Sequence, residues 1–493
     1  MRLCVFPIAL AASVLSIQAQ TKRELTLCQA IRVAQEQSYS AQMAKLQLLS
    51  AYWSYRSFRA ELLPSVTLSG NLMNFDRSMT SVRNYENGKV NYVEDNQLSN
   101  NLSLSISQNI PLTGGTVSLE SYVYRLDEFN YDLTTYYSQP FRITYTQPLR
   151  SYNTLRWQQK TEPLELEKAK KVYLETMEDV ACQCTALFFN VLSAQSSYKE
   201  NESNFFDRTQ LMTQAGKRFQ LGTLNKSELL QLELSQLNAK VQLNQSGIDV
   251  KDARFQFFSY LLMVDYGDVD LVAPVSLPEI ILNVDEVVAM ALENSSHNLE
   301  QRLDVLESEQ ELAEAKSARG IQLSLSASLG MNKTAYSFTD VYRQLDDNEV
   351  VGVTLSLPIF DWGVSKGRVQ VAKANLEVVK TEVEQANLEF IQDLRKRVLQ
   401  FNSQGEQCRN AQRAVEIAEE RYGITKRRFE NGSISVTDLN TAWQEMQSAR
   451  SQFIDQIETY WTQYYALRKL TLHDFSLNAK IDVDFDCMFK EFR

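Results

Sequence analysis

Long helices with one apolar face dominate the pattern of the chain. From Val364 to about Tyr422, small or apolar residues recur at alternating steps of three and four, which is the spacing of a heptad seam. The seam positions are Val369, Ala372, Leu376, Val379, Val383, Ala386 and Phe390. About 58 helical residues make a rod of roughly 85 to 90 Å, longer than a globular-domain helix. After a predicted turn at 427–433, the seam resumes from Leu439 to Leu467, so we expect a coiled-coil pair.

Six shorter segments alternate apolar with small polar residues, which predicts β-strands with one apolar and one serine-rich face. The expected strands are 65–75, 97–110, 116–124, 141–147, 321–331 and 351–357. The connection at 111–115 is short, whereas 76–96, 125–139 and 332–349 are long and polar, so we expect loops there. Short turns on one side and long loops on the other are typical of outer-membrane barrels.

The same unit occurs twice along the chain. Thr26–Gln29 and Asn283–Glu286 both have the form of a capping box, at an offset of 257 residues. The pair Pro148-Leu149 and the motif after Arg218 recur at an offset of 210. The first half therefore holds 257 − 210 = 47 additional residues, about one extra hairpin. We expect a first repeat at 21–270, a second at 271–472 and a C-terminal tail at 473–493.

Six strands with an apolar face cannot close a barrel alone, because transmembrane barrels start at eight strands. An open sheet edge would leave backbone groups unpaired in lipid. If these strands enter a membrane, several chains must share one barrel, and the serine-rich face lines an aqueous lumen. The alternative from periodicity alone is an ordinary half-buried antiparallel sheet.

Composition narrows the function. Residues 1–20 read as a signal peptide, with Arg2 ahead of an apolar run. The net charge of −11 and the absence of a Lys/Arg run argue against nucleic acid binding. With only His297 and His473, and no phosphate loop or nucleophile elbow, we expect no enzyme, no cofactor and no metal site. We expect His297 to face solvent and the five cysteines after the signal peptide to be small packing residues.

From Leu25 to about Leu472, this duplicated unit of capped helix, strands, long helix, turn and long helix resembles the TolC-type outer-membrane efflux protein family. The most specific motifs are 218–224 with Glu228 and 428–434 with Asp438. The resemblance implies an α+β membrane protein and a homotrimer, in which a transmembrane antiparallel β-barrel continues into an α-helical coiled-coil barrel in the periplasm. It also implies outer-membrane lipid, a periplasmic adaptor and an inner-membrane pump as partners.

By this resemblance, the helix tips carry the functional residues. The candidates for a periplasmic aperture are Glu228, Phe429 and Asp438. The candidates for adaptor contact are Arg218, Gly222, Thr223, Arg428, Gly432 and Ser433. Glu228 and Asp438 have the alternative role of capping the return helices. Ile434 and Thr441 occupy positions where well-known members have charged gate residues, so this chain departs from the family there.

The expected function is that of a passive outer-membrane duct that receives substrates from an inner-membrane pump. A secreted, soluble coiled-coil scaffold or adhesin-like protein without a lumen is the alternative. The family generally has two strands per half and twelve per trimer, whereas six strands per chain would give eighteen. The exported substrate, the class of pump and the place of the extra hairpin stay open at the level of sequence.

Overall fold

The computed structural model describes residues 23–83, 88–222, 225–263, 269–272, 274, 277–431 and 433–490, so the predicted signal peptide at 1–20 lies outside the described residues. The chain forms two compact units. The first draws on the ranges Met1–Ala44, Leu174–Met290 and Leu394–Ile481. The second draws on Lys45–Tyr173, Ala291–Asp393 and Asp482–Arg493. Each unit takes residues from both predicted repeats.

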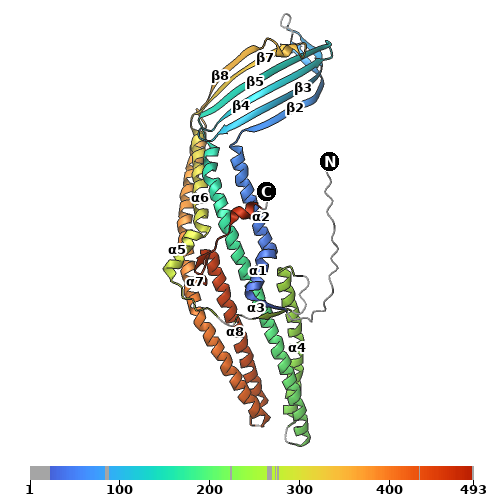
Figure 1. Ribbon diagram of the computed structural model, residues 1–493, viewed down its shortest axis with the longest axis vertical. Coiled ribbons are helices and arrows are strands. Elements are labelled where there is room, and N and C mark those ends of the chain that lie inside the picture. Colours follow the sequence, from blue (N-terminus) through green and yellow to red (C-terminus); the bar gives the residue numbers. More distant parts are fainter. Residues whose placement is uncertain are drawn as a thin grey trace, which may run out of the picture. The chain divides into compact units, whose positions relative to one another are not determined.

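A six-stranded antiparallel sheet belongs to the second unit (Figure 1). Its strands, in spatial order, are β2 (Ser65–Arg83), β3 (Val90–Ile110), β4 (Gly115–Glu128), β5 (Leu133–Arg150), β7 (Gln322–Ala335) and β8 (Asp346–Ser356). Each of the six expected strands lies within or overlaps one of these. The extra hairpin of the first half therefore belongs to the same sheet as the other strands.

The two faces of the sheet differ as the alternation predicts. One row of directly opposed residues, all exposed, is Val66, Ile106, Leu119, Ile143 and Leu329. The neighbouring row, on the other face, is Ser65, Ser107, Ser118, Thr144 and Ser328. On this polar face the hydroxyls of opposed serines bond across the strands, as Ser65 and Ser107 do at 2.9 Å. The sheet thus has an apolar face and a hydroxyl-lined face.

The strands extend further than the alternation indicated, so the expected loops at 76–96, 125–139 and 332–349 were too long. β2 and β3 stay paired up to Arg83 opposite Val90. In this extension polar residues occur on both faces, and Arg77 forms an ion pair with Glu94 at 2.6 Å. Backbone ladder bonds do not require apolar side chains, so the period-two signal disappears before the strand ends.

The described helices of the second unit pack against one another. α6 (His297–Arg319) and α7 (Val364–Glu430) share a small apolar cluster of Leu312, Val369, Ala372 and Leu376. The expectation for His297 was wrong. Its ring stacks on Phe390 with centroids 4.2 Å apart, and its Nε2 lies 2.9 Å from Asn387 Oδ1. In the predicted tail, α9 (Phe485–Lys490) stacks Phe489 on Tyr52 of α2 (Tyr39–Glu61) at 4.1 Å.

The first unit has the main apolar core. It lies among α1 (Leu27–Gln37), α3 (Thr154–Gln220), α4 (Lys226–Tyr260), α5 (Val284–Asn294) and α8 (Val436–Thr471). Phe188 contacts Phe189 and Phe257 edge to face, at centroid distances of 5.7 and 5.9 Å. Such aromatic pairs contribute beyond the area they bury. Large rings therefore fix the helices of this unit.

The predicted helix starts are largely confirmed. Thr26 and Gln29 form the expected capping box, each side chain bonding the other's backbone N–H. At the second start, Asn283 Oδ1 accepts from the N–H of Asp285, and its Nδ2 donates to Glu286, so the residues are right but the box is not closed. Two short strand pairs were not expected: β1 (Arg23–Thr26) with β6 (Val269–Val272), and β9 (His473–Asp474) with β10 (Ala479–Lys480). Segments this short have no readable period.

The long helices exceed the expected length. α3 and α7 each contain 67 residues, and Arg427 to Glu430, which we expected in the turn, are the last turn of α7. The turn signal Asn431-Gly432 comes only after Glu430, and Arg427 and Arg428 favour the helix C-terminus, where the dipole is negative. Among the described residues, no helix has the length and hydropathy of a membrane span.

The cysteine prediction holds for three of the five thiols. Cys184 and Cys408 are buried and Cys182 is half-buried among the helices of the first unit. Cys28 and Cys487 are exposed, so the prediction was wrong for these two. Burial raises the pKa of the Cys184 thiol to about 12, which makes it an unreactive packing residue.

Phe188→Ala tests the aromatic core. Because Phe188 is fully buried, we expect a loss of about 3 to 5 kcal/mol in the free energy of unfolding. Phe188→Leu refills most of the space and should cost about 1 to 2 kcal/mol. Chemical unfolding in detergent, followed by circular dichroism, measures both. Equal losses in the two variants would contradict a packing role for the ring.

Candidate functional site

The sequence motifs lie at the ends of two helical hairpins, α3–α4 and α7–α8. Each return helix starts with a complete capping box. The N–H of Glu228 donates to Asn225 Oδ1 at 2.8 Å, and the N–H of Asn225 donates to the Glu228 carboxylate at 3.2 Å. Ser435 and Asp438 repeat the arrangement at 3.2 and 3.1 Å. The capping role of Glu228 and Asp438 is therefore confirmed, and an aperture role would come in addition.

The turn residues are placed as a tight connection requires. Gly222 has a φ of +73°, the left-handed conformation that glycine adopts at no steric cost. The N–H of Ser433 donates to the carbonyl of Arg428 at 2.9 Å, which closes the end of α7. Arg218 and Arg428 lie in the last turns of α3 and α7. The other two adaptor-contact candidates, Thr223 and Gly432, lie outside the described residues.

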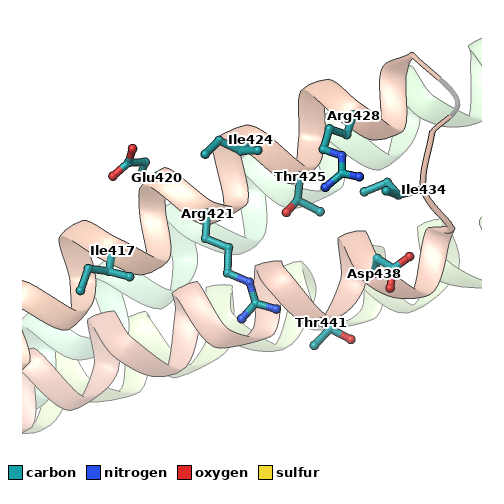
Figure 2. Close-up of a pocket in the computed structure, with 9 residues that line it drawn as sticks. All are labelled: Ile417, Glu420, Arg421, Ile424, Thr425, Arg428, Ile434, Asp438 and Thr441. Carbon is teal, nitrogen blue, oxygen red and sulfur yellow. The ribbon is translucent and has the colours of Figure 1, made fainter.

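A cleft of ≈ 640 Å³ lies between α7 and α8 beside the second turn. Figure 2 shows Arg421 and Arg428 extending from α7 and Asp438 and Thr441 placed on α8. The hydrogen bonds from Ser435 hold the pKa of Asp438 below its usual value, and the positive charge of Arg428 acts in the same direction. The carboxylate thus stays ionised in mildly acidic solution. Ile434 also lines the cleft.

Phe429 lies against a small apolar cluster that joins the two hairpins. The buried members are Ala215 of α3, Leu232 of α4 and Val436 of α8, and Phe429 packs against them half-buried. A side-chain bond from Gln231 to Thr437, at 3.4 Å, also connects α4 with α8. Three of the four tip helices therefore supply the buried cluster, and α7 contributes the aromatic ring.

Polar contacts connect the hairpins beside this cluster. Lys426 Nζ lies 2.8 Å from Asp207 Oδ1, and the hydroxyl of Tyr422 donates to Asp207 Oδ2 at 3.1 Å. Asp207 belongs to α3 and the other two to α7. These contacts fix one hairpin to the other through groups that water can replace.

A second set of charges lies on the same helices. Arg450 of α8 contacts Glu200 of α3 at 3.4 Å and Glu419 of α7 at 2.5 Å. The Glu200 side chain is only 6% exposed. We call these six residues the inter-hairpin network: Glu200, Asp207, Glu419, Tyr422, Lys426 and Arg450.

Burial and neighbouring charges shift the pKa values of Glu200 and Arg450 in opposite directions. Burial raises the pKa of Glu200, and the nearby Arg450 and the hydroxyl of Ser196 limit the rise. Burial alone would lower the pKa of Arg450, but its hydrogen bonds and the charges of Glu419 and Glu200 raise it above the usual value. The protonation of Glu200 therefore depends on whether Arg450 is in place.

The inter-hairpin network was not among the sequence candidates, although the sequence contains a signal for it. Buried residues of α3 recur at steps of three and four through Asn201, Asn204, Arg208, Leu211 and Ala215. Three of these five seam positions are polar. Polar residues at seam positions specify register and partner at a cost in stability, so they indicate a contact other than simple packing.

α4 has an apolar stripe that the described part of the chain leaves exposed. Leu230, Leu234, Leu237 and Val241 are 52 to 66% exposed, and Ile248 and Phe255 continue the stripe at 60% each. The steps of three, four and seven are those of a heptad seam. Among the described residues there is no group of three or more His, Cys, Asp or Glu side chains that could hold a metal ion.

Comparison with known proteins identifies relatives of this arrangement. Residues 287–471 match the family model described as outer membrane efflux protein. This match confirms the resemblance that the repeated helix–strand pattern indicated. No protein with a curated description matches the chain.

Solved structures show the same fold at low identity. The outer membrane channel CmeC of Campylobacter jejuni superposes with a TM-score of 0.67 at 16% identity, over 94% of this chain and 88% of that one. The outer membrane protein VceC of Vibrio cholerae gives 0.61 at 13%, over 92% and 97%. The open state of the MtrE outer membrane channel of Neisseria gonorrhoeae gives 0.61 at 15%, over 93% and 91%.

Arg450→Met tests the electrostatics of the inter-hairpin network. Without Arg450 the pKa of Glu200 rises further above its unfolded value, so the folded state holds the extra proton more strongly. Stability is then retained at low pH and lost as pH rises through that pKa. We expect a loss of about 2 kcal/mol in the free energy of unfolding at pH 8 that shrinks toward pH 5.

Chemical unfolding at a series of pH values measures this loss. The double variant Glu200→Gln/Arg450→Met lacks the Glu200 carboxylate, so its stability deficit should not show this additional pH dependence. A deficit in Arg450→Met that is constant from pH 5 to pH 8 would contradict the proposed coupling.

Proposed function

We propose, from the match of residues 287–471 to the outer membrane efflux protein family and the fold shared with outer membrane channels, that this chain forms a homotrimeric, passive duct through the outer membrane. Substrates would enter from an inner-membrane pump, which supplies the energy, and leave to the exterior. The observation that carries the proposal is the six-stranded sheet with one apolar, exposed face and one hydroxyl-lined face.

The chemistry of the sheet suits lipid on one side and water on the other. Exposing the apolar row from Val66 to Leu329 to water is unfavourable, and transferring these side chains into hydrocarbon would lower the free energy. The serine face suits an aqueous lumen. Six strands are fewer than a closed barrel requires, so several copies have to share one barrel.

Aromatic residues occur toward both ends of the apolar face. Tyr145 follows Ile143 on this face, toward the end of β5 that leads into α3. Toward the other end, Tyr136 contacts Phe338 at 5.8 Å and Arg125 lies over the Tyr136 ring at 5.9 Å. Tyrosines and basic residues at such positions favour the two interfaces of a bilayer.

The exposed stripe of α4 supports association of the helices as well. A heptad seam with side chains more than half exposed is stable only when another helix covers it. A second copy of the chain is the partner that the family fold provides. The open edges of the sheet and the exposed stripe of α4 therefore both support the proposal of a homotrimer.

We assign the hairpin turns to contact with a periplasmic adaptor. Arg218, Gly222, Arg428 and Ser433 lie at these turns, and the candidates Thr223 and Gly432 neighbour them in sequence. Glu228, Phe429 and Asp438 would line the aperture beside the turns. Asp438, repeated in each copy, would give a ring of carboxylates that favours cations.

The inter-hairpin network would hold this aperture closed. It joins α3 to α7 and α8 without any charge at Ile434 or Thr441, the positions where the chain departs from the family. Opening would separate the hairpins and hydrate Asp207, Lys426 and Tyr422. Such a gate needs no chemical step in this chain.

Fractionation and conductance test the duct. We expect the native protein in the outer-membrane fraction, soluble only with detergent, as a trimer that conducts ions in planar bilayers. A monomer in the soluble periplasmic fraction, with no conductance, would contradict the duct and favour the secreted scaffold.

Lys426→Ala tests the gate. A partly exposed ion pair contributes about 1 kcal/mol, so its loss should raise the open-to-closed ratio about fivefold in single-channel recordings. Lys380→Ala on the same helix removes an exposed pair with Glu377 inside α7 and should leave the ratio unchanged. An equal change of the open-to-closed ratio in both variants, or no change in Lys426→Ala, would contradict the role of Lys426 in the gate.

A further inference from the structure

Two edges of the six-stranded sheet have no partner strand among the described residues. They belong to β2 and β8, the first and last strands in the spatial order. In hydrocarbon, each unpaired N–H and C=O of such an edge costs several kcal/mol, so a membrane sheet is stable only when its edges meet. The inference below rests on the duct as the proposed function and specifies how its wall closes.

The sheet already has the slant that closure requires. A line of directly opposed residues starts at the first residue of β2, Ser65, and crosses every strand to Val350 of β8; its members are Ser65, Ser107, Ser118, Thr144, Ser328 and Val350. β8 continues beyond Val350 to Ser356. Six strands are therefore staggered by six residues, one residue per strand. An eight-stranded barrel of shear eight has the same ratio and a strand tilt of about 36°.

We propose that β8 of one copy pairs antiparallel with β2 of the next, with Ser356 opposite Ser65. Three six-stranded sheets then close as one barrel of eighteen strands. The direction follows from the sheet, because neighbouring strands alternate and β2 and β8 run in opposite senses. Because of the stagger of six residues, the last residue of β8 and the first residue of β2 in the next copy lie opposite each other at this seam.

The side chains of the two edges match in this register. Leu355 lies opposite Val66 and Val353 opposite Leu68, which joins apolar residues on the lipid face. Thr354 lies opposite Thr67 on the hydroxyl-lined face. A slip by one residue would place the leucine and valine side chains on the lumen side. The two faces therefore exclude every register that is shifted by an odd number of residues.

The extra hairpin widens the exit. With a strand spacing of about 4.8 Å and a tilt of about 36°, eighteen strands give a backbone radius of about 17 Å. Twelve strands with the same geometry give about 11 Å. The cross-section that the backbone encloses therefore roughly doubles relative to a twelve-stranded barrel. On the lumen face, small hydroxyl side chains such as Ser107, Ser118 and Thr144 occupy the rows near the short turn, and the larger Glu120, Tyr122, Tyr124 and Arg142 follow further along the strands.

Disulfide trapping tests the seam. In a variant with Cys28 and Cys487 replaced by serine, we would introduce cysteines as the pairs Ser65→Cys/Ser356→Cys, Thr67→Cys/Thr354→Cys and Leu68→Cys/Val353→Cys. The last two are adjacent in an antiparallel ladder, so one is of the close, non-hydrogen-bonded type, within the range of a disulfide. The serine and threonine exchanges are nearly isosteric, which preserves folding.

We expect oxidation in the membrane to produce dimer and trimer bands on non-reducing gels in at least one of these pairs, and reductant to abolish them. Thr67→Cys/Val353→Cys places the thiols on opposite faces and should give monomer only. Thr67→Cys/Ser356→Cys serves as the control for a register shifted by two residues. Each single-cysteine variant controls for nonspecific dimers.

Three results would overturn the proposal. Trimer bands in Thr67→Cys/Ser356→Cys alone would mean that the register is shifted by two residues and that the barrel has a different shear. A disulfide within one chain, identified by peptide mass analysis, would mean that β2 and β8 meet in the same copy. Absence of cross-links in every matched pair, while the parent protein is a conducting trimer, would mean that the edges do not meet. A parent protein that neither reaches the membrane nor conducts would instead contradict the duct itself.

Discussion

Backbone hydrogen bonding at the edges of the sheet is the constraint on which the rest depends. Five ladders, from β2–β3 to β7–β8, form within one chain, and among the described residues β2 and β8 are the strands with an open outer edge. In water, solvent would satisfy them, whereas in hydrocarbon each unpaired group costs several kcal/mol. For a chain whose sheet enters lipid, association with further copies is then part of folding. The exposed heptad stripe of α4 has the same requirement, so both units favour the same assembly.

The sequence predicts the kind of element well because both periods are strong. Steps of three and four give α7 and α8, and alternation gives all six strands of the sheet. The ends were harder to predict. β3 begins at Val90 although alternation starts only near Gln97, since the ladder continues where both faces are polar. α7 continues through Arg428 because the pair Asn431-Gly432, the turn signal that ends it, comes only after Glu430. The parallel pair β1–β6 depends on a contact between segments 246 residues apart, which no local pattern encodes.

The candidate site was only partly predictable, for a related reason. Motifs at the hairpin turns are local, and the capping roles of Glu228 and Asp438 follow from three-residue spacing. Asp207 and Lys426 are 219 positions apart, and their contact depends on how two hairpins dock. The sequence marks such contacts only indirectly, through polar residues at positions where a coiled coil would place leucine.

Those polar seam positions suit the proposed gate, in which two ordered hairpins separate at their tips. A continuous apolar seam would expose its whole surface on opening, at about 25 cal/mol per Å². At the tips the described buried apolar cluster is small: Ala215, Leu232 and Val436 are buried, and Met212, Leu229 and Phe429 pack against them. The contacts of Asp207 with Tyr422 and Lys426 beside it are a hydrogen bond and an ion pair. Water replaces such contacts at about 1 kcal/mol each. A partner that binds the separated tips even tenfold more tightly offsets one such contact, because that preference is worth about 1.4 kcal/mol.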